Sequence, residues 1–508
     1  MIVVPRAGKA LILALFCVSA AACGSKSGVQ PKRVDSAVLQ SQVSDPLERA
    51  FYQARQWQAA WDGKSEKALL DIVGRAPANG LKPDLFLKRD LPADPSAREA
   101  ALTRVALRYA SALADGYADP RKLREIYTLP RPTMNVAAGL AQALADGELD
   151  QWFASLVPQT DEYRALSEAH LQYLRLATTA QAQPIPAGKA IKPGQRDPRV
   201  PQVAAALAAS GYLAAPANAE EEQAAVQRYS PAMVAAMRRL QADYGLKPDA
   251  IVGPDTLAVL NSGPSDRARQ LAVALERLRW LERSPPATRI DVNTAAAFLQ
   301  YIRGGRPVDR RNVVVGEPGW ETPQLQSQMF QLVANPLWRV PDSILEDELS
   351  KKSGAYLAAN GFEWRDGRLV QRSGEKNSLG LVKFDLTNKQ SIYLHDTPAK
   401  ALFALPDRHR SHGCIRVDNA LQFAAMIAAE NAILDELEEG LASGDETYVK
   451  LKSEIPVRLL YHTAFLDGGR VHFRPDVYGW DDDVAYAIGL KRGPPRKAYK
   501  RPAEDIGP

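Results

Sequence analysis

One cysteine far along the chain stands among residues that could activate it. Cys414 lies in the run Ser411-His412-Gly413-Cys414-Ile415-Arg416, and a second histidine lies upstream in Tyr393-Leu394-His395-Asp396. No other cysteine occurs after residue 23. A thiolate is a strong nucleophile, and a nearby imidazole can take the proton from the thiol. The combination therefore predicts a cysteine nucleophile with a histidine base.

Residue types alone leave open which histidine is the base. His412 is two residues from Cys414, so on a strand both side chains would lie on the same face. His395 would have to be brought close by folding. The alternative for Cys414 itself is a buried thiol acting as a small apolar side chain. A closed zinc site is disfavoured, because this region offers one cysteine and no HExxH-type pair; we expect no metal.

The N-terminus predicts export from the cytoplasm. Arg6 and Lys9 flank an apolar run at 10–18, and small residues lead into Cys23. That run is too short for a spanning helix. The small residues resemble a bacterial lipobox, in which Cys23 becomes a lipidated N-terminus, although Ala20 stands where that pattern prefers Leu. Cleavage after Ala22 without lipidation, or a retained anchor, is the alternative. We expect a periplasmic protein anchored to a membrane through Cys23.

Composition describes an ordinary globular protein of several domains. The chain has 508 residues, of which 46% are hydrophobic and 24% charged, with a net charge of +5. Basic and acidic residues are mixed throughout, which disfavours a nucleic-acid partner. In an oxidising compartment a structural cysteine would need a mate. Cys414 has no obvious one, which again favours the nucleophile.

Changes in periodicity and in Pro and Gly content divide the chain. We expect a multidomain α+β protein with an all-helical N-terminal part and a mainly β C-terminal part. The predicted segments are a signal peptide 1–22, a tether 23–45, a helical domain 46–180, a linker 181–202, a small helical unit 203–262, a connecting helix 263–288, a mainly β domain 289–483 with an insertion at 335–373, and a basic Pro-rich tail 484–508.

The small helical unit resembles a known wall-binding module. Ser230 can cap a helix whose first residue is Pro231. This helix is followed by Gly-Leu-x-x-Asp from Gly245 and by Val-Gly-Pro-x-Thr from Val252. The order resembles the three-helix peptidoglycan-binding module of cell-wall enzymes. A plain helical hairpin is the alternative.

The β region places both motif segments at strand ends. Strands are predicted at 289–293, 312–315, 329–333, 381–386 and 390–394. A helix follows, with Asp418 as its predicted N-cap. His395 then falls just after one strand, and Cys414 falls beside Ile415-Arg416-Val417. Loop and strand ends on a rigid sheet commonly carry catalytic groups.

The motifs of this region resemble the L,D-transpeptidase catalytic domain. His395, residues 396–410 and then Ser411-His412-Gly413-Cys414 follow the pattern of that family. The flanking segments resemble its large, scaffold-bearing members from Gram-negative bacteria: 335–341, 377–384, 394–398 and 461–465. The resemblance covers most of the mature chain. It implies a helical scaffold, a peptidoglycan-binding module and a β-rich catalytic domain, whose insertion 335–373 caps the substrate.

The resemblance also implies a role for each residue. Cys414 would be the nucleophile and His395 the base, with Asp396 orienting the imidazole through its backbone carbonyl. His412, Gly413 and the Cys414 amide would shape the oxyanion hole. Substrate contacts are expected from four further residues, although for Arg416 a structural salt bridge is the alternative and for Trp338 ordinary packing: Arg416, Ser411, Trp338 and Tyr393.

The implied reaction is acyl transfer between peptidoglycan stems. Cys414 would attack the third residue of a tetrapeptide, expel D-Ala and pass the acyl group to a neighbouring stem, giving a 3→3 cross-link. Water as acceptor would give an L,D-carboxypeptidase, and a lipoprotein lysine a lipoprotein transferase. A non-catalytic wall tether is the non-enzymatic alternative. We expect no cofactor. The expected partners are peptidoglycan, a membrane through Cys23, and peptidoglycan synthases or carboxypeptidases. We also expect acylation by carbapenems.

Overall fold

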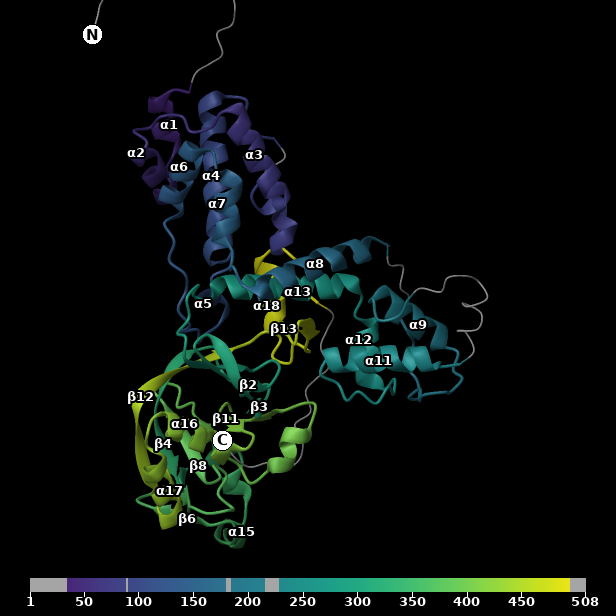
Figure 1. The fold of residues 1–508 in the computed structure, drawn as a ribbon, viewed down its shortest axis with the longest axis vertical. Helices are drawn as coiled ribbons and strands as arrows, with labels where there is room; N and C mark the ends of the chain where they lie inside the picture. The colour runs from purple at the N-terminus through teal and green to yellow at the C-terminus, as the bar shows by residue number, and fades with distance from the viewer. Residues whose placement is uncertain (1–33, 88–89, 180–183, 215–227, 494–508) are drawn as a thin grey trace, which may run out of the picture.

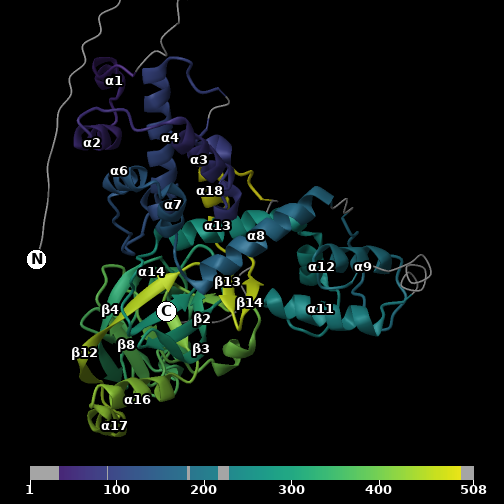
Figure 2. The same ribbon diagram turned by 45° about the horizontal axis from the view of Figure 1, so that its top comes forward.

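Three parts of the protein meet at a pair of crossing helices. The computed structural model describes residues 34–87, 90–179, 184–214 and 228–493. Figure 1 shows a helical part at the top, a small helical unit at the right and a β-rich part at the bottom. Helices α8 (Asp161–Thr179) and α13 (Pro264–Trp280) pack against each other where the three parts join, and Figure 2 shows the same arrangement from a second direction.

The helical part is built around α4 (Pro95–Asp115). Asp94 caps this helix by accepting from the Ala97 N–H, and Gly116, with φ of 95°, follows its last residue. The other elements pack around α4 or at its ends: α1 (Ser36–Gln42), α2 (Pro46–Ala54), α3 (Gly63–Gly74), η1 (Ala76–Asn79), η2 (Pro83–Leu85), α5 (Pro120–Leu123), α6 (Val136–Asp146) and α7 (Leu149–Leu156). Among the described residues, no helix is both long enough and apolar enough to cross a membrane.

Two segments predicted to lie outside the folded domains belong to the core of this part. The predicted tether 23–45 is wrong for its second half: Asp35 caps α1, and Leu39 is fully buried. The predicted tail from 484 is wrong for its beginning, because Val484 and Ile488 of the α18 region (helix Trp480–Ala487) are buried among the N-terminal helices. Each segment carries too few apolar residues to show a helical period in the sequence.

The small helical unit has the predicted helix start. Ser230 accepts from the Met233 N–H, and Pro231 begins α11 (Pro231–Asp243). Helices α9 (Val200–Ala209) and α12 (Pro254–Asn261) complete the unit. The predicted linker 181–202 is wrong where it is described. Ile185 and Ile191 are buried in this core, and Ile191 pairs with Val252, so the segment is part of the folded unit.

A nine-stranded sheet forms the β-rich part and closes on itself. Its order is β10-β3-β11-β9-β8-β4-β12-β1-β2, and β2 also pairs with β3. Helix α16 (Ala420–Glu430) packs Phe423 and Ile427 into the core of the sheet, and α17 (Leu434–Ser443) follows. The strands are β1 (Arg289–Asn293), β2 (Phe298–Arg303), β3 (Arg306–Gly316), β4 (Gln326–Ala334), β8 (Val382–Leu386), β9 (Leu394–His395), β10 (His409–Ser411), β11 (Ile415–Val417) and β12 (Thr447–Leu460).

The insertion between β4 and β8 forms a subdomain with its own core. Its three-stranded sheet has the order β5-β7-β6. Trp338, Ile344 and Leu349 are buried together at its centre. The elements are β5 (Trp338–Arg339), α14 (Asp342–Asp347), η3 (Leu349–Lys351), α15 (Gly354–Ala359), β6 (Phe362–Arg365) and β7 (Arg368–Gln371). We call this unit the cap subdomain.

The remaining elements join the β-rich part to its neighbours. A hairpin, β13 (Ala464–Asp467) and β14 (Arg470–Phe473), packs against α8, α11 and α13. Arg277 of α13 forms an almost completely buried ion pair with Asp481 of α18. The short helix η4 (Lys400–Ala404) leads from β9 towards β10. Overall, a helical N-terminal part and a mainly β C-terminal part are confirmed.

Candidate active site

Strand pairing brings the two motif segments together. β9 and β11 are parallel neighbours, with Leu394 opposite Ile415 and His395 opposite Arg416. The Ile415 N–H donates to the Tyr393 carbonyl at 3.1 Å. Side chains alternate along a strand, so His395 and Arg416 share a face with Tyr393 and Cys414, which lie two residues earlier on each segment. The sheet therefore places the thiol and the imidazole on one face of two adjacent segments.

A turn, rather than the predicted strand 390–394, leads into His395. Ser391 has φ of 55°, in the left-handed region, and only Leu394 and His395 form a strand. The Asn388 side chain accepts from the Gln390 and Ile392 N–H groups and so holds the turn. As a result, the Ser391 carbonyl oxygen lies 3.7 Å from the Cys414 sulfur.

His395 is held as a neutral imidazole with one nitrogen available. Its Nδ1 lies 2.5 Å from the Asp396 carbonyl oxygen. Because a carbonyl only accepts, Nδ1 carries the proton and Nε2 keeps its lone pair. Nε2 is buried without a hydrogen-bond partner among the described residues. Burial, followed by the positive charge of Arg416, holds the pKa of His395 well below its usual value.

The Asp396 side chain fixes the backbone that orients this ring. One carboxylate oxygen accepts from the Leu381 N–H at 3.1 Å, and the other pairs with Lys400. Gly380, with φ of 62°, lies so close that a Cβ there would come within 2.3 Å of the carboxylate. The Asp396 N–H also donates to the Val382 carbonyl. Asp396, whose carbonyl accepts the hydrogen bond from His395, is therefore held by contacts with β8 and η4.

The Cys414 thiol is buried and predominantly protonated at neutral pH. The residue is 6% exposed. Burial raises the pKa of the thiol to about 11, even though hydrogen bonds from the Tyr393 backbone and side chain favour the thiolate. Cys414 and His395 therefore form a neutral pair at pH 7. Such a pair would transfer the proton as the sulfur attacks.

The loop before the cysteine is braced internally by Ser411. Its hydroxyl donates to the Cys414 carbonyl at 2.6 Å and accepts from the Gly413 N–H at 3.2 Å. Gly413 has φ of 110°, a conformation that a residue with a side chain rarely adopts. The Gly413 N–H is thus already bonded, whereas for the Cys414 N–H we find no acceptor in the described chain. The Cys414 amide is the better placed oxyanion donor.

A second brace reaches this loop from the connection between β3 and β4. The Thr322 hydroxyl donates to the Gly413 carbonyl at 2.8 Å and accepts from the Gly316 N–H at 2.9 Å. The Tyr478 hydroxyl donates to the Gly316 carbonyl at 2.6 Å. Gly316 is required here, because a Cβ would come within 2.0 Å of the Trp320 carbonyl oxygen. Neither Thr322 nor Tyr478 was among the residues predicted from the sequence.

His412 is held by a residue of the cap subdomain. Its Nε2 lies 2.9 Å from a carboxylate oxygen of Glu348, and both side chains are largely buried. The Trp320 ring packs edge-on against the imidazole, with 5.0 Å between ring centroids. His412 therefore lies between the cap subdomain and the β3–β4 connection.

Three regions of the chain match known families. Residues 287–449 match the "L,D-transpeptidase catalytic domain", residues 47–170 the "Scaffold domain", and residues 196–260 the "Putative peptidoglycan binding domain". Residues 287–449 are therefore similar to the catalytic domain of L,D-transpeptidases. The motif pair His395 and Cys414 lies inside the first match.

Similar proteins occur among curated sequences and among solved structures. A protein of Haemophilus influenzae named "Putative L,D-transpeptidase" is 30% identical over 251 residues, which is 44% of this chain and 51% of that protein. The chain thus matches about half the length of this relative. Among solved structures, an L,D-transpeptidase from Mycobacterium smegmatis is 14% identical over 34% of this chain and 58% of its own, with a TM-score of 0.21. One from Xylanimonas cellulosilytica is 15% identical over 54% of this chain and 98% of its own, with a TM-score of 0.19.

Two residues of the predicted substrate-binding set are buried in the structure. Ser411 is fully buried and braces the loop. Trp338 is 1% exposed and packs against Phe362 in the cap core. Ser411 and Trp338 were predicted because each is a polar or aromatic residue beside a motif. Their burial could not be read from the sequence.

The other predicted residues remain near the nucleophile. Tyr393 is half-buried, with its ring 5.7 Å from the imidazole of His395. Arg416 is 1% exposed and lies beside His395, whose pKa its charge depresses. This position makes Arg416 an electrostatic neighbour of the base. Cys23, the predicted lipidation site, lies outside the described residues.

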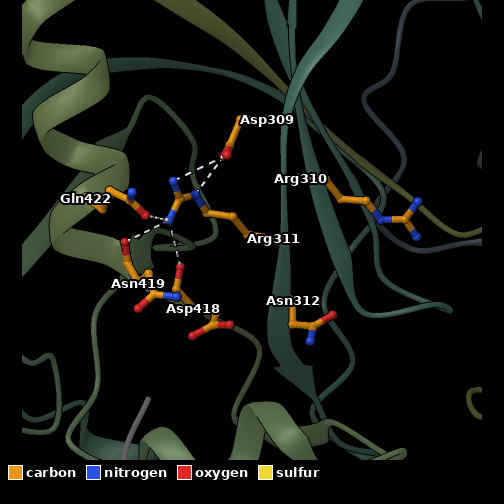
Figure 3. A pocket seen from close by; sticks show the side chains of 7 residues that line it. All are labelled: Asp309, Arg310, Arg311, Asn312, Asp418, Asn419 and Gln422. Atoms are coloured by element: carbon orange, nitrogen blue, oxygen red, sulfur yellow. Dashed lines mark hydrogen bonds and ion pairs between the residues drawn. The ribbon is translucent and has the colours of Figure 1, made fainter.

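A polar cavity of about 310 Å³ lies past the other end of β11, where it meets the start of α16. Figure 3 shows Arg311 among the residues that line the cavity. Its guanidinium donates to the Asp309 carboxylate and to the Asn419 carbonyl. Asn419, with φ of 50°, and not the predicted Asp418, precedes α16, and no side chain caps that helix. Arg311 therefore stabilises this turn, and the cavity is separate from the thiol.

Proposed function

We propose that this protein is a cysteine-dependent L,D-transpeptidase that forms 3→3 cross-links between peptidoglycan stem peptides. The observation that carries the proposal is the placement of Cys414 and His395 on one face of two paired segments, with His395 Nδ1 bonded to the Asp396 carbonyl. Peptidoglycan as the substrate is supported by the peptidoglycan-binding and transpeptidase matches.

The chemistry would begin with a neutral thiol and a neutral imidazole. As the Cys414 sulfur attacks the carbonyl carbon of the third stem residue, the thiol proton passes to His395 Nε2. The negative charge that develops on the carbonyl oxygen is stabilised by the Cys414 N–H. Collapse breaks the bond to the terminal D-Ala. His395 gives its proton to the departing amine, leaving a thioester on Cys414.

The second half of the reaction reverses these proton transfers. The side-chain amine of a diamino acid on a neighbouring stem attacks the thioester carbon, and His395 takes a proton from it. The carbon–sulfur bond breaks, and the sulfur recovers its proton from His395. A new amide joins the third residues of two stems. Water in place of the amine would give a shortened stem, and a lipoprotein lysine would give a protein attached to the wall.

Export, anchoring and partners complete the proposal. The signal-like N-terminus and Cys23 support a periplasmic location with a lipid anchor. A membrane-held enzyme with a wall-binding unit would act on the peptidoglycan close to that membrane. The helical scaffold offers a surface for peptidoglycan synthases or carboxypeptidases. Carbapenems, as acyl donors, would acylate Cys414.

The test is mass spectrometry of disaccharide-tetrapeptide after incubation with the mature protein. Release of D-Ala with 3→3 dimers, abolished in Cys414→Ala and Cys414→Ser, is the expected result. His395→Gln should lose most of the activity while its melting temperature stays near that of the wild type. Release of D-Ala without dimers would instead identify a carboxypeptidase. No product and no carbapenem adduct would favour a wall tether.

A further inference from the structure

The strongest contact that the sequence did not predict joins Glu348 of the cap subdomain to His412. Glu348 follows α14 and precedes Leu349, which is fully buried in the cap core. Its backbone is therefore set by the cap fold. From there its carboxylate reaches His412 Nε2 at 2.9 Å, in the loop that carries the nucleophile.

Both side chains of this contact are largely buried, which strengthens the hydrogen bond between them. The His412 side chain is 3% exposed and that of Glu348 is 11% exposed. A hydrogen bond to a charged group in such a setting contributes more than one at the surface, and leaving its partner unsatisfied is costly. Because a carboxylate accepts, Nε2 of His412 carries a proton, and this fixes the tautomer of the ring.

The ring is confined from a second direction. Trp320 packs edge-on against it, and Trp320 belongs to the same connection as Thr322, which holds the Gly413 carbonyl. His412 is therefore oriented by the cap subdomain on one side and by the β3–β4 connection on the other. Its backbone leads through Gly413 to Cys414, so the orientation of the ring and the path of the loop are linked.

We propose that Glu348 is a positioning residue for the transpeptidase reaction. It fixes the ring of His412 and thereby the loop that presents the Cys414 thiol and N–H. The cap subdomain then completes the active site in addition to covering it. This inference rests on the proposed function, because its readout is turnover on tetrapeptide stems.

The test compares Glu348→Ala with Glu348→Gln in the mature protein. The glutamine oxygen can still accept from His412, whereas alanine cannot. We expect Glu348→Ala to lower kcat on the order of ten-fold to a hundred-fold with little change in KM. Glu348→Gln should recover most of the loss. Glu346→Ala is the matched control, because Glu346 lies two residues earlier, in α14, and is exposed.

A second readout does not depend on turnover. Nitrogen-15 spectra of the histidine rings should show His412 with its proton on Nε2 in the wild type and in Glu348→Gln. In Glu348→Ala that signal should shift towards a mixture of tautomers, with a melting temperature near that of the control.

Three results would overturn the proposal. They are a kcat for Glu348→Ala equal to that of Glu346→Ala, a rise in KM alone, or an unchanged His412 tautomer. A wild-type protein without activity would instead count against the proposed function. The ring spectra would still decide whether Glu348 positions His412.

Discussion

At the scale of single residues, the site is governed by burial. The thiol of Cys414 and the imidazole of His395 are both buried, and burial moves their pKa values apart in the directions that keep both groups neutral. This differs from an exposed cysteine–histidine pair, in which a thiolate and an imidazolium stabilise each other. Both directions favour a neutral thiol beside a neutral imidazole in the folded protein.

This electrostatic state predicts how Cys414 reacts with iodoacetamide. Only the thiolate is alkylated, and the pKa of the thiol is raised to about 11. The rate at Cys414, followed by peptide mass spectrometry, should therefore still be rising at pH 10. For an ordinary thiol the rate levels off above about pH 9. A rate that reached its plateau by pH 8 would show that a thiolate is already formed in the resting site.

At the scale of elements, two connections hold the loop that leads into Cys414. The turn at Ser391 presents a carbonyl to the sulfur, and the β3–β4 connection supports Gly413 from the other side. Neither connection is a regular strand. Their geometry is set by the side chains of Asn388 and Thr322, which accept hydrogen bonds from the Ile392 and Gly316 N–H groups. The closed sheet positions the chain, and these two connections set the final path of the loop.

Thr322 allows this view to be tested. Thr322→Val keeps the shape of the side chain but leaves the Gly316 N–H and the Gly413 carbonyl unsatisfied, each at a cost of about 1–3 kcal/mol. We expect a lower melting temperature and at least a ten-fold loss of kcat. Thr322→Ser keeps the hydroxyl and should lose far less of both. Equal activity of the valine and serine variants would show that the loop holds its path without this brace.

The sequence predicted those helices and strands whose apolar residues recur with a clear period. It also placed the segments that contain His395 and Cys414 at strand ends. The start of α11 at Ser230 and Pro231 was correct, because capping depends on neighbouring residues alone. Cys414 and His395 were singled out by their residue types and spacing, and Asp396 by the family resemblance; strand pairing brings the first two to one face, and Asp396 accepts from His395. Thr322, Tyr478 and Glu348 were not found. Their contacts join segments far apart in the chain, and those contacts exist only after folding.

At the scale of the whole molecule, buried neutral histidines link stability to pH. His170, on α8, donates from Nδ1 to the Pro77 carbonyl at 2.8 Å, and burial lowers its pKa to about 4. Burial lowers the pKa of His462, near the interdomain junction, to about 3. The unfolded chain takes up a proton at each of these sites near pH 6.5, whereas the folded protein does not. Stability is therefore full above that pH and is lost as the pH falls below it.

His170→Gln tests this linkage. Over the window from pH 6.5 to about 4, His170 alone should account for about 3 kcal/mol of lost stability. Glutamine can still donate to Pro77 and does not titrate. Its melting temperature, measured by calorimetry, should fall less between pH 7 and pH 5 than that of the wild type. Glu168→Gln, at an exposed position on the same helix, is the control. An equal fall in all three proteins would contradict the assignment.

The return of the chain to the N-terminal helices has a consequence for its biogenesis. Val484 and Ile488 lie in the same core as Leu39 and Leu107, which are made hundreds of residues earlier. A chain that is synthesised from its N-terminus cannot finish that core until almost all of it has been made. The core of the helical part is therefore incomplete until the last residues of the described chain have been made. When that core is complete, residues 287–449, which lie between the two segments in the chain, have already been made.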